Sequence, residues 1–198
     1  MRLASAQRLR VGHGTVRVET SDGAIDAPHV VVAAGCWAGQ IDLAGAPPLP
    51  VRPVRGQLLA LGLPARPVDR AVWGPGCYMV PWPDGTVLVG ATVEEAGFDE
   101  HATVDGVAGL LTAAPKILPA LGRAGFHGVR VGLRPGTPDD RPIVGRSSRV
   151  EGLIYATGHY RNGALLAPIT AEIVADLVEG RQADHARAPF AAARFGEY

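Results

Sequence analysis

The 198-residue sequence is poor in several kinds of residue, and each shortage excludes a class of protein. Its two cysteines, Cys36 and Cys77, are too few for a disulfide-stabilised scaffold or a cysteine-rich metal site. Its formal net charge is zero, so it offers no electrostatic footprint for nucleic acid or an anionic membrane. It has no run of about 18 apolar residues, and its first residues lack the apolar core of a signal peptide. We therefore expect a cytoplasmic protein without a nucleic-acid or membrane partner.

The common catalytic and cofactor motifs are also missing. The sequence contains no HExxH, no GxSxG and no P-loop, and its six histidines are scattered, so no metal site is predicted. The dinucleotide-binding fingerprint GxGxxG is absent as well. Its nearest approach, Gly12-His13-Gly14, lacks the third glycine and lies outside a strand–helix junction. Any chemistry must therefore depend on other residues.

The residues that are present indicate a folded, turn-rich protein. Glycine (26 residues) and proline (17 residues) accompany 47% hydrophobic residues, which is typical of a folded chain rather than a disordered one. The prolines of segment 46–50 are expected to keep it extended, so we predict that this segment links two parts of the chain. Periodicity and turn residues predict strands at 15–19, 30–34, 54–61, 71–73, 78–80, 86–90, 129–133 and 153–156, and helices at 103–114 and 163–179.

Some of these elements carry more specific expectations. The apolar run 30–34 suits a strand buried on both faces, as in a parallel sheet. Thr103 is expected to cap a helix that ends at Pro115, and Pro135-Gly136 is expected to end a strand. Leu165 is expected on the apolar face of the last helix.

Three segments could bind a ligand. The turn Gly158–Gly163 precedes a helix whose exposed amides could hold an anion or an electron-rich ring edge, although it could also be an ordinary strand-to-helix turn. Arg134, braced by Pro135, could bind a carboxylate bidentately or form a surface salt bridge. Tyr78 could line a pocket or could be a core aromatic with a satisfied hydroxyl.

Together these segments resemble one family. The chain is similar to the D-amino acid oxidase group of FAD-dependent amine oxidoreductases, and most similar to its glycine oxidase branch, which belongs to thiamine biosynthesis. The resemblance rests on the stretches Val30–Trp37, Pro53–Gln57, Cys77–Pro81, Val89–Thr92, Gly132–Thr137, Pro142–Gly145 and Gly158–Pro168. These stretches occur in the family's order and cover nearly the whole chain.

The resemblance implies a role for several side chains in binding substrate. Arg134 would pair with the substrate carboxylate, and Tyr78 would donate a second hydrogen bond to it. Arg161 would lie beside the substrate and the flavin, and Val93 would line the small side-chain pocket. The residues implied to contact FAD are Ala34, Gly35, Trp37, His159, Tyr160, Arg161, Asn162, Gly163, Ala164 and Leu165.

The implied reaction is the oxidative deamination of glycine or a D-amino acid. A hydride passes from the substrate to the flavin, and O2 takes the electrons to give hydrogen peroxide. The implied fold is α+β, with an α/β FAD-binding remnant and an antiparallel or mixed substrate-binding sheet. The expected division is 1–45 for the distal FAD-binding part, 46–133 for the substrate domain and 134–198 for the return to the FAD-binding part.

The missing fingerprint suggests that the chain corresponds to the C-terminal half of the family. About thirty residues precede the strand at 30–34, too few for a Rossmann βαβ unit and the remainder of its domain. We therefore expect the N-terminal half to be a missing partner and Met1 to be an internal or misassigned start or the product of a gene fragment. We also expect FAD to bind weakly or not at all. Two alternatives stay open: a non-catalytic folded fragment, and a sarcosine oxidase-like activity. The apolar content also permits a homo-oligomer.

Overall fold

The computed structural model describes residues 3–43, 45–181, 188–196 and 198, and they form two compact units. The first unit comprises Met1–Pro53 and Arg134–Tyr198, and the second comprises Val54–Leu133. The chain thus changes unit at 53/54 and 133/134, whereas the sequence placed these boundaries at 45/46 and 133/134. Helices, antiparallel strands and two parallel pairs, β1 with β5 and β4 with β12, are all present among the described residues, which confirms the α+β class.

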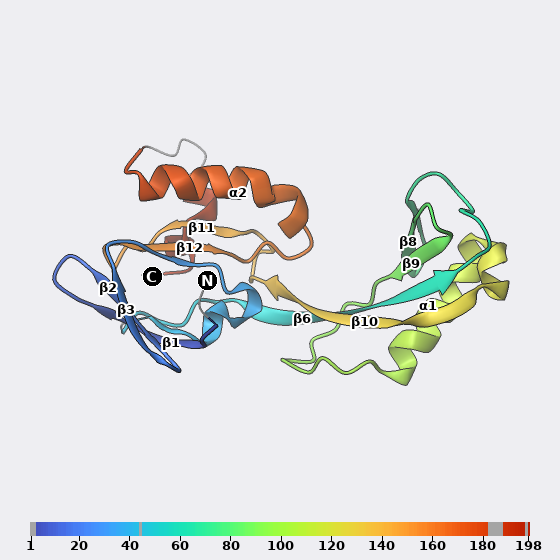
Figure 1. Ribbon diagram of the computed structural model, residues 1–198, viewed down its shortest axis with the longest axis horizontal. Coiled ribbons are helices and arrows are strands. Elements are labelled where there is room, and N and C mark those ends of the chain that lie inside the picture. Colours follow the sequence, from blue (N-terminus) through green and yellow to red (C-terminus); the bar gives the residue numbers. More distant parts are fainter. Residues whose placement is uncertain (1–2, 44, 182–187, 197) are drawn as a thin grey trace. The chain divides into compact units, whose positions relative to one another are not determined.

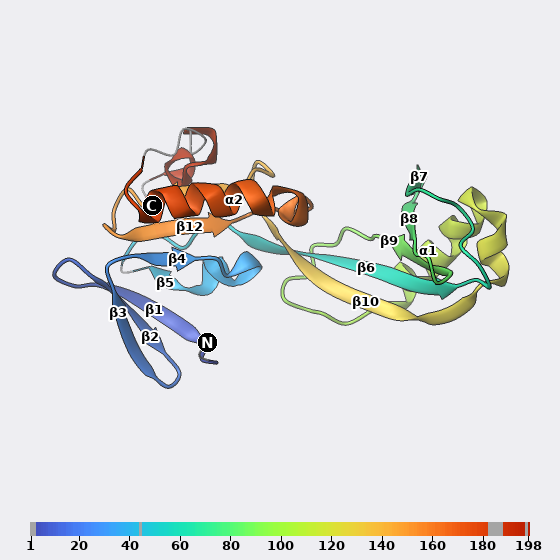
Figure 2. The same cartoon turned by 45° about the horizontal axis from the view of Figure 1, so that its top comes forward.

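Two sheets make up the first unit (Figures 1 and 2). The four-stranded sheet has the order β3-β2-β1-β5, and the three-stranded sheet has the order β11-β12-β4. Strand β12 is antiparallel to β11 and parallel to β4. The bounds of these strands are β1 Ala6–Val11, β2 Val16–Thr20, β3 Gly23–Ala27, β4 Val30–Val32, β5 Asp42–Leu43, β11 Ile143–Arg146 and β12 Leu153–Thr157.

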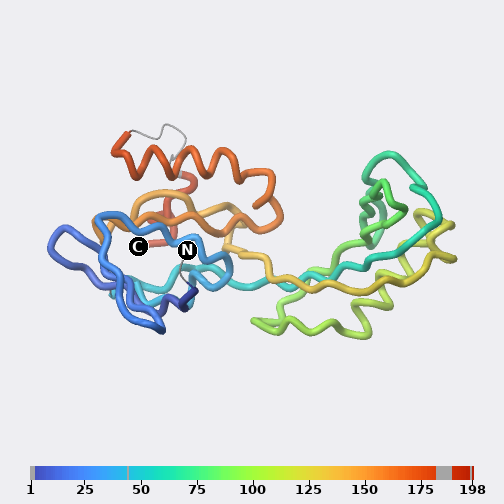
Figure 3. The backbone as a smooth tube through the Cα atoms, in the orientation of Figure 1, coloured from blue at the N-terminus to red at the C-terminus, as the bar shows by residue number. Residues whose placement is uncertain are grey.

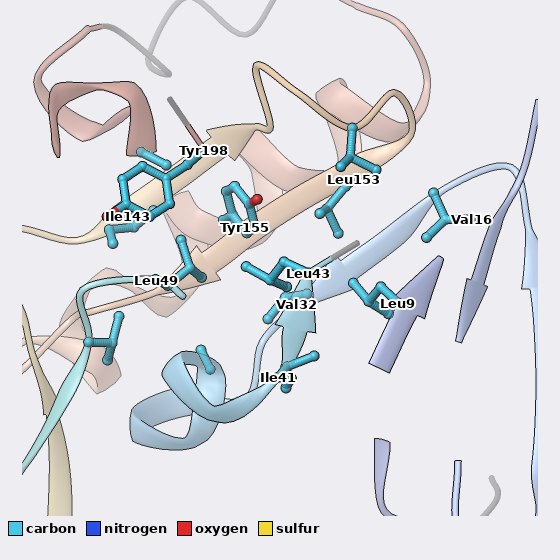
Figure 4. Close-up of a cluster of buried hydrophobic side chains, with 14 residues drawn as sticks. Leu9, Val16, Val32, Ile41, Leu43, Leu49, Ile143, Leu153, Tyr155 and Tyr198 are labelled. Atoms are coloured by element: carbon cyan, nitrogen blue, oxygen red, sulfur yellow. The ribbon is translucent and has the colours of Figure 1, made fainter. Parts of the chain in front are cut away.

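Side chains on β12 alternate between two hydrophobic clusters. Leu153 and Tyr155 point into a cluster that also holds residues of β1, β4 and β5 (Figure 4). Ile154 points to the opposite face, where Ile173 of helix α2 (Gly163–Val178) covers it. This burial on both faces explains why the strand is a continuous apolar run rather than an alternating one.

Strand β4 and helix α2 depart from the sequence expectations in part. The expected strand 30–34 ends at Val32, and Val31 is 37% exposed, so burial on both faces is wrong for this edge strand. Leu165 of α2 is 79% exposed, so its expected place on the apolar face is also wrong. The rest of the predicted apolar face is found further along α2, where Ile173 and Leu177 are buried and Ile169 is partly buried.

The second unit holds most of a five-stranded sheet of order β10-β6-β9-β8-β7, with β6 and β10 as long neighbouring strands (Figure 3). One face of this sheet packs on helix α1 through a cluster that includes Leu59, Met79 and Leu110. A short 3-10 helix, η2, completes the unit. The bounds are β6 Arg52–Gly62, β7 Val72–Gly74, β8 Cys77–Pro81, β9 Thr86–Gly90, α1 Val104–Ile117, η2 Pro119–Arg123 and β10 Gly125–Gly136.

Two prolines lie inside elements that the sequence expected them to end. Thr103 caps α1 by accepting a hydrogen bond from the Gly106 N–H at 3.2 Å, as predicted. The helix nevertheless continues past Pro115 to Ile117, because the helical φ suits proline and the missing N–H costs one hydrogen bond on a partly exposed turn. Strand β10 likewise includes Pro135, which an edge strand tolerates.

Within the first unit, Arg194 of the 3-10 helix η4 (Ala192–Phe195) joins the C-terminal segment to the turn that follows β10. Arg194 Nε and Nη2 donate to the two carboxylate oxygens of Asp139 at 2.9 and 3.0 Å. Its Nη2 also donates to the Arg141 carbonyl at 2.8 Å. The pKa of Asp139 falls to about 2, chiefly because Arg194 donates to it. No helix among the described residues is long and apolar enough to cross a membrane.

The Asp139–Arg194 pair is expected to make stability depend on acid pH. A lowered folded-state pKa contributes stability above the unfolded value near 4, and this contribution is lost as pH falls toward 2. Asp139→Asn should therefore lower the free energy of unfolding by about 1–2 kcal/mol at pH 7, with a smaller difference at pH 3. Urea titrations at both pH values measure this, with Asp140→Asn in the same exposed turn as the control. An equal loss at both pH values would contradict the assigned cause.

Gly85, in the β8–β9 hairpin, should not tolerate a side chain. Its φ is +86°, and an added Cβ would lie 2.1 Å from the Leu63 carbonyl oxygen. Gly97 has a φ of +60° with nothing within 4 Å of the added Cβ. A substitution there therefore measures the cost of the backbone conformation alone, without a steric clash. Gly85→Ala should lower the free energy of unfolding by roughly 3 kcal/mol and Gly97→Ala by about 1 kcal/mol. Equal losses in thermal or urea unfolding would show that the contact with Leu63 is unimportant.

Candidate active site

The side chains singled out from the sequence are divided between the two units. Tyr78 and Val93 belong to the second unit, and Arg134 and Arg161 belong to the first. The other candidate residues also lie in the first unit: Ala34, Gly35, Trp37, His159, Tyr160, Asn162, Gly163, Ala164 and Leu165.

The residues between β12 and α2 form a tight loop. Gly158 has a φ of +75°, and an added Cβ would lie 2.7 Å from Thr137 Cγ2, so this position requires glycine. Tyr160 also has a positive φ, +49°, and the Asn162 N–H donates to the His159 carbonyl at 2.9 Å. The chain therefore reverses over a short stretch and enters α2 directly.

This loop is joined to the segment that carries Arg134. The Tyr160 N–H donates to the carbonyl of Pro135, the residue after Arg134, at 3.0 Å. Arg134 is half-buried at the end of β10. Arg161 is exposed, with its guanidinium carbon 5.4 Å from the centre of the Tyr160 ring. The structure thus places the segment that carries Arg134 next to the loop that carries Arg161.

A second hydrogen bond joins the same loop to the end of β4. Thr157, the last residue of β12, donates its hydroxyl hydrogen to the Gly35 carbonyl at 2.8 Å. Gly35 begins the 3-10 helix η1 (Gly35–Gln40), and Trp37 in that helix is 47% exposed. Strands β4 and β12 are parallel, so their carboxyl ends lie at one edge of the sheet, where α/β proteins bind ligands.

The N-terminus of α2 presents polar donors. Asn162 occupies the cap position, but its side chain makes no capping hydrogen bond, and the first turn contains no acidic residue. The first backbone bond of the helix is that of the Leu166 N–H to the Asn162 carbonyl at 2.8 Å. The preceding amides, from Gly163 to Leu165, therefore point out of the helix end with its partial positive charge. Such an end suits an electron-rich group.

His159 fixes the loop rather than supplying a charge. Its Nε2 lies 2.9 Å from Oγ1 of Thr170, a residue within α2. Burial lowers the pKa of His159, so the imidazole is neutral near pH 7. The histidine thus ties the loop to the helix that comes after it. No cluster of His, Cys, Asp or Glu side chains in the described part of the chain could hold a metal ion.

Tyr78 does not lie in the core of the second unit. Its neighbours on β8, Cys77 and Met79, are buried, whereas Tyr78 is half-buried on the opposite face. Its ring lies 4.7 Å from that of Trp73, and an added Cβ at Gly90 would meet its hydroxyl at 2.9 Å. The hydroxyl therefore lies above Gly90, near the start of the segment that carries the half-exposed Val93. Tyr78 thus faces away from the buried cluster of the second unit.

Sequence reasoning missed a buried polar network in the second unit. Arg55 is 6% exposed and Gln57 is fully buried, both on the otherwise apolar strand β6. Arg55 Nε and Nη2 donate to Glu94 Oε2 at 2.8 and 2.6 Å, and its Nη1 donates to Asp99 Oδ2 at 2.6 Å. Gln57 Nε2 donates to Glu94 Oε1 at 2.8 Å and to Thr103 Oγ1 at 2.9 Å. An arginine and a glutamine inside an apolar strand were the signal that could have revealed it.

The acidic members of this network are held ionised. The pKa of Asp99 falls to about 2, mainly because the His101 backbone N–H and ring donate to it and also because Arg55 does. Partial burial alone would raise the pKa of Glu94. Hydrogen bonds, first from Thr92 and then from Arg55, outweigh the burial, so the pKa of Glu94 is lowered.

Comparisons with known proteins assign the chain to a family. A profile described as FAD dependent oxidoreductase matches residues 3–177. The bifunctional protein ThiO/ThiG of Synechocystis sp. is 42% identical over 180 residues, which cover 88% of this chain and 26% of that protein. The glycine oxidase of Pseudomonas aeruginosa is 39% identical over 185 residues, which cover 93% of this chain and 51% of that protein.

A solved structure gives the same result. The crystal structure of glycine oxidase from Geobacillus kaustophilus is similar with a TM-score of 0.90 and 34% identity, over 96% of this chain and 52% of that one. The chain thus spans about half the length of the glycine oxidases that it matches, and a quarter of the bifunctional protein. The resemblance inferred from the motifs is confirmed, and the chain belongs to the FAD dependent oxidoreductase family.

Proposed function

We propose that this chain carries the substrate-binding residues and the flavin-facing helix end of an FAD-dependent oxidase of small amino acids, with glycine as the first candidate substrate. The observation that carries the proposal is the hydrogen bond between the Tyr160 N–H and the Pro135 carbonyl. This hydrogen bond joins the loop before α2 to the end of β10, which presents Arg134. The N-terminus of α2 has no side-chain cap and is suited to an electron-rich ring.

The residues of the first unit fit FAD. The outward-facing amides of Gly163 to Leu165 suit the electron-rich edge of the flavin ring, and the turn at Ala34 and Gly35 would contact the adenosine half. His159 and Tyr160 would hold the loop against the cofactor, and Trp37 and Asn162 complete the proposed contact set. Bound FAD would supply a two-electron oxidation of the amine and pass the electrons to O2.

The side chains of the chain itself would bind and orient the substrate. Arg134 would hold the carboxylate through two parallel N–H bonds, and the Tyr78 hydroxyl would donate a further one. Arg161 would add a second positive charge next to the substrate. Val93, with its half-exposed side chain, would limit the size of the substrate side chain. A neutral His159 fits a mechanism in which the protein moves no proton and the amine arrives deprotonated.

Arg134→Ala should weaken substrate binding far more than turnover. Loss of a bidentate pair is expected to raise KM at least ~100-fold, with a smaller change in kcat. Glycine-dependent peroxide formation is measured on the protein as its own host produces it, beside the exposed Arg70→Ala as a control. Unchanged glycine oxidation in Arg134→Ala would refute this assignment. A KM for sarcosine far below that for glycine would make the secondary amine the substrate class.

The 198 residues alone should bind FAD weakly, because the sequence holds no GxGxxG phosphate loop. We expect a Kd above about 10 µM, which corresponds to no more than about 7 kcal/mol of binding free energy. Titration of FAD with the purified chain, followed by flavin fluorescence, measures it. A stoichiometric yellow protein after purification would overturn this expectation. Complete absence of binding and activity in the host's protein would favour a non-catalytic folded module.

A further inference from the structure

The buried network around Arg55 does more than fill the interior of the second unit. Its members come from strand β6 and from the segment 91–103, which links β9 to α1 and has no regular secondary structure. The backbones of Arg55 and Glu94 also exchange two hydrogen bonds, at 2.8 and 3.0 Å. An irregular segment is thus held to a buried strand by both its backbone and its side chains.

Arg55 contacts the segment at three places. It donates to the carboxylate of Glu94, to the carboxylate of Asp99 and, at 3.2 Å, to the carbonyl of His101. The rigid guanidinium fork allows these contacts at the same time, which the single ammonium of a lysine cannot reproduce. Gln57 then joins Glu94 to Thr103, the cap of α1. Both ends of the segment are therefore fixed.

The fixed segment carries the proposed pocket residue. Val93 precedes Glu94 directly, and its side chain is 50% exposed while Glu94 turns inward to Arg55. The segment starts next to Gly90, above which the Tyr78 hydroxyl lies. A shift of Glu94 would therefore move Val93 with respect to Tyr78.

We propose that Arg55 is a positioning residue that sets the size selectivity of the substrate pocket by holding the segment 91–99 through Glu94 and Asp99. The proposal rests on the proposed function, since it concerns the pocket of that same reaction. The energetic argument is that a buried arginine needs both carboxylates, so the segment has one low-energy position. Arg55 touches no reacting atom in this role.

Two measurements on Arg55→Lys test the proposal. Hydrogen exchange of the 198-residue chain, which needs no cofactor, should show amides in 91–99 exchanging at least ~10-fold faster, with β9 unchanged. In the host's protein, the preference for glycine over D-alanine, measured as the ratio of kcat/KM values, should fall at least ~5-fold, and saturated glycine turnover should stay within about 3-fold. Arg66→Lys, an exposed arginine of the same unit that pairs locally with Asp69, is the matched control.

The outcomes separate positioning from general stability. A lower melting temperature with unchanged exchange in 91–99 and unchanged selectivity would overturn the proposal. If Arg55→Lys does not fold, Glu94→Gln removes one charge at constant size and should show the same changes to a lesser degree. Absence of amino acid oxidation in the unaltered protein would overturn the proposed function and the selectivity role with it. The exchange experiment would still decide whether Arg55 holds the segment.

Discussion

Strand β12 has to satisfy neighbours on both edges and both faces, and the arrangement of the first unit results from that requirement. Its edges pair with β11 and β4, and its faces pack on the large cluster and on α2. A strand confined in this way ends at a fixed point, so the loop after Thr157 starts from a fixed point as well. The hydrogen bonds of Thr157 to Gly35 and of Tyr160 to Pro135 then bring three distant segments to one edge. The candidate site is thus a consequence of how the core is packed.

The second unit positions its candidate residues by a different physical means. Segment 91–103 lacks regular secondary structure, so hydrophobic packing alone would leave it several positions. A buried arginine with two carboxylates restricts it, because breaking either pair would leave a charge without its partner in the interior. Such a network adds little net stability, because the cost of removing its charges from water offsets most of their attraction. It nevertheless discriminates strongly between alternative positions of the segment. That property suits a pocket wall better than a core.

Sequence patterns foresaw the elements with strong periodicity and missed what depends on tertiary contacts. Helix α2 and strands β8, β9 and β12 lie within about two residues of their predicted ranges, because turn residues and apolar spacing act locally. Pro115 and Pro135 were expected to end their elements, but a partly exposed helix turn and a sheet edge tolerate the lost donor. Leu165 matched the helical spacing but lies on the outer face, since periodicity cannot say which of two adjacent leucines faces the sheet.

For the candidate site, the motifs predicted which residues would face a ligand, but they did not predict the residues that hold these segments in place. Arg134 and the loop after Thr157 were evident as motifs, and the hydrogen bond between their segments joins residues far apart in the sequence and has no local pattern. Arg55 was visible as a charged residue in an apolar strand and as part of the stretch Pro53–Gln57, but its carboxylate partners Glu94 and Asp99 lie well downstream of it. Binding chemistry depends on residue type, which a sequence displays directly. Positioning depends on distance in space, which becomes apparent only once the chain is folded.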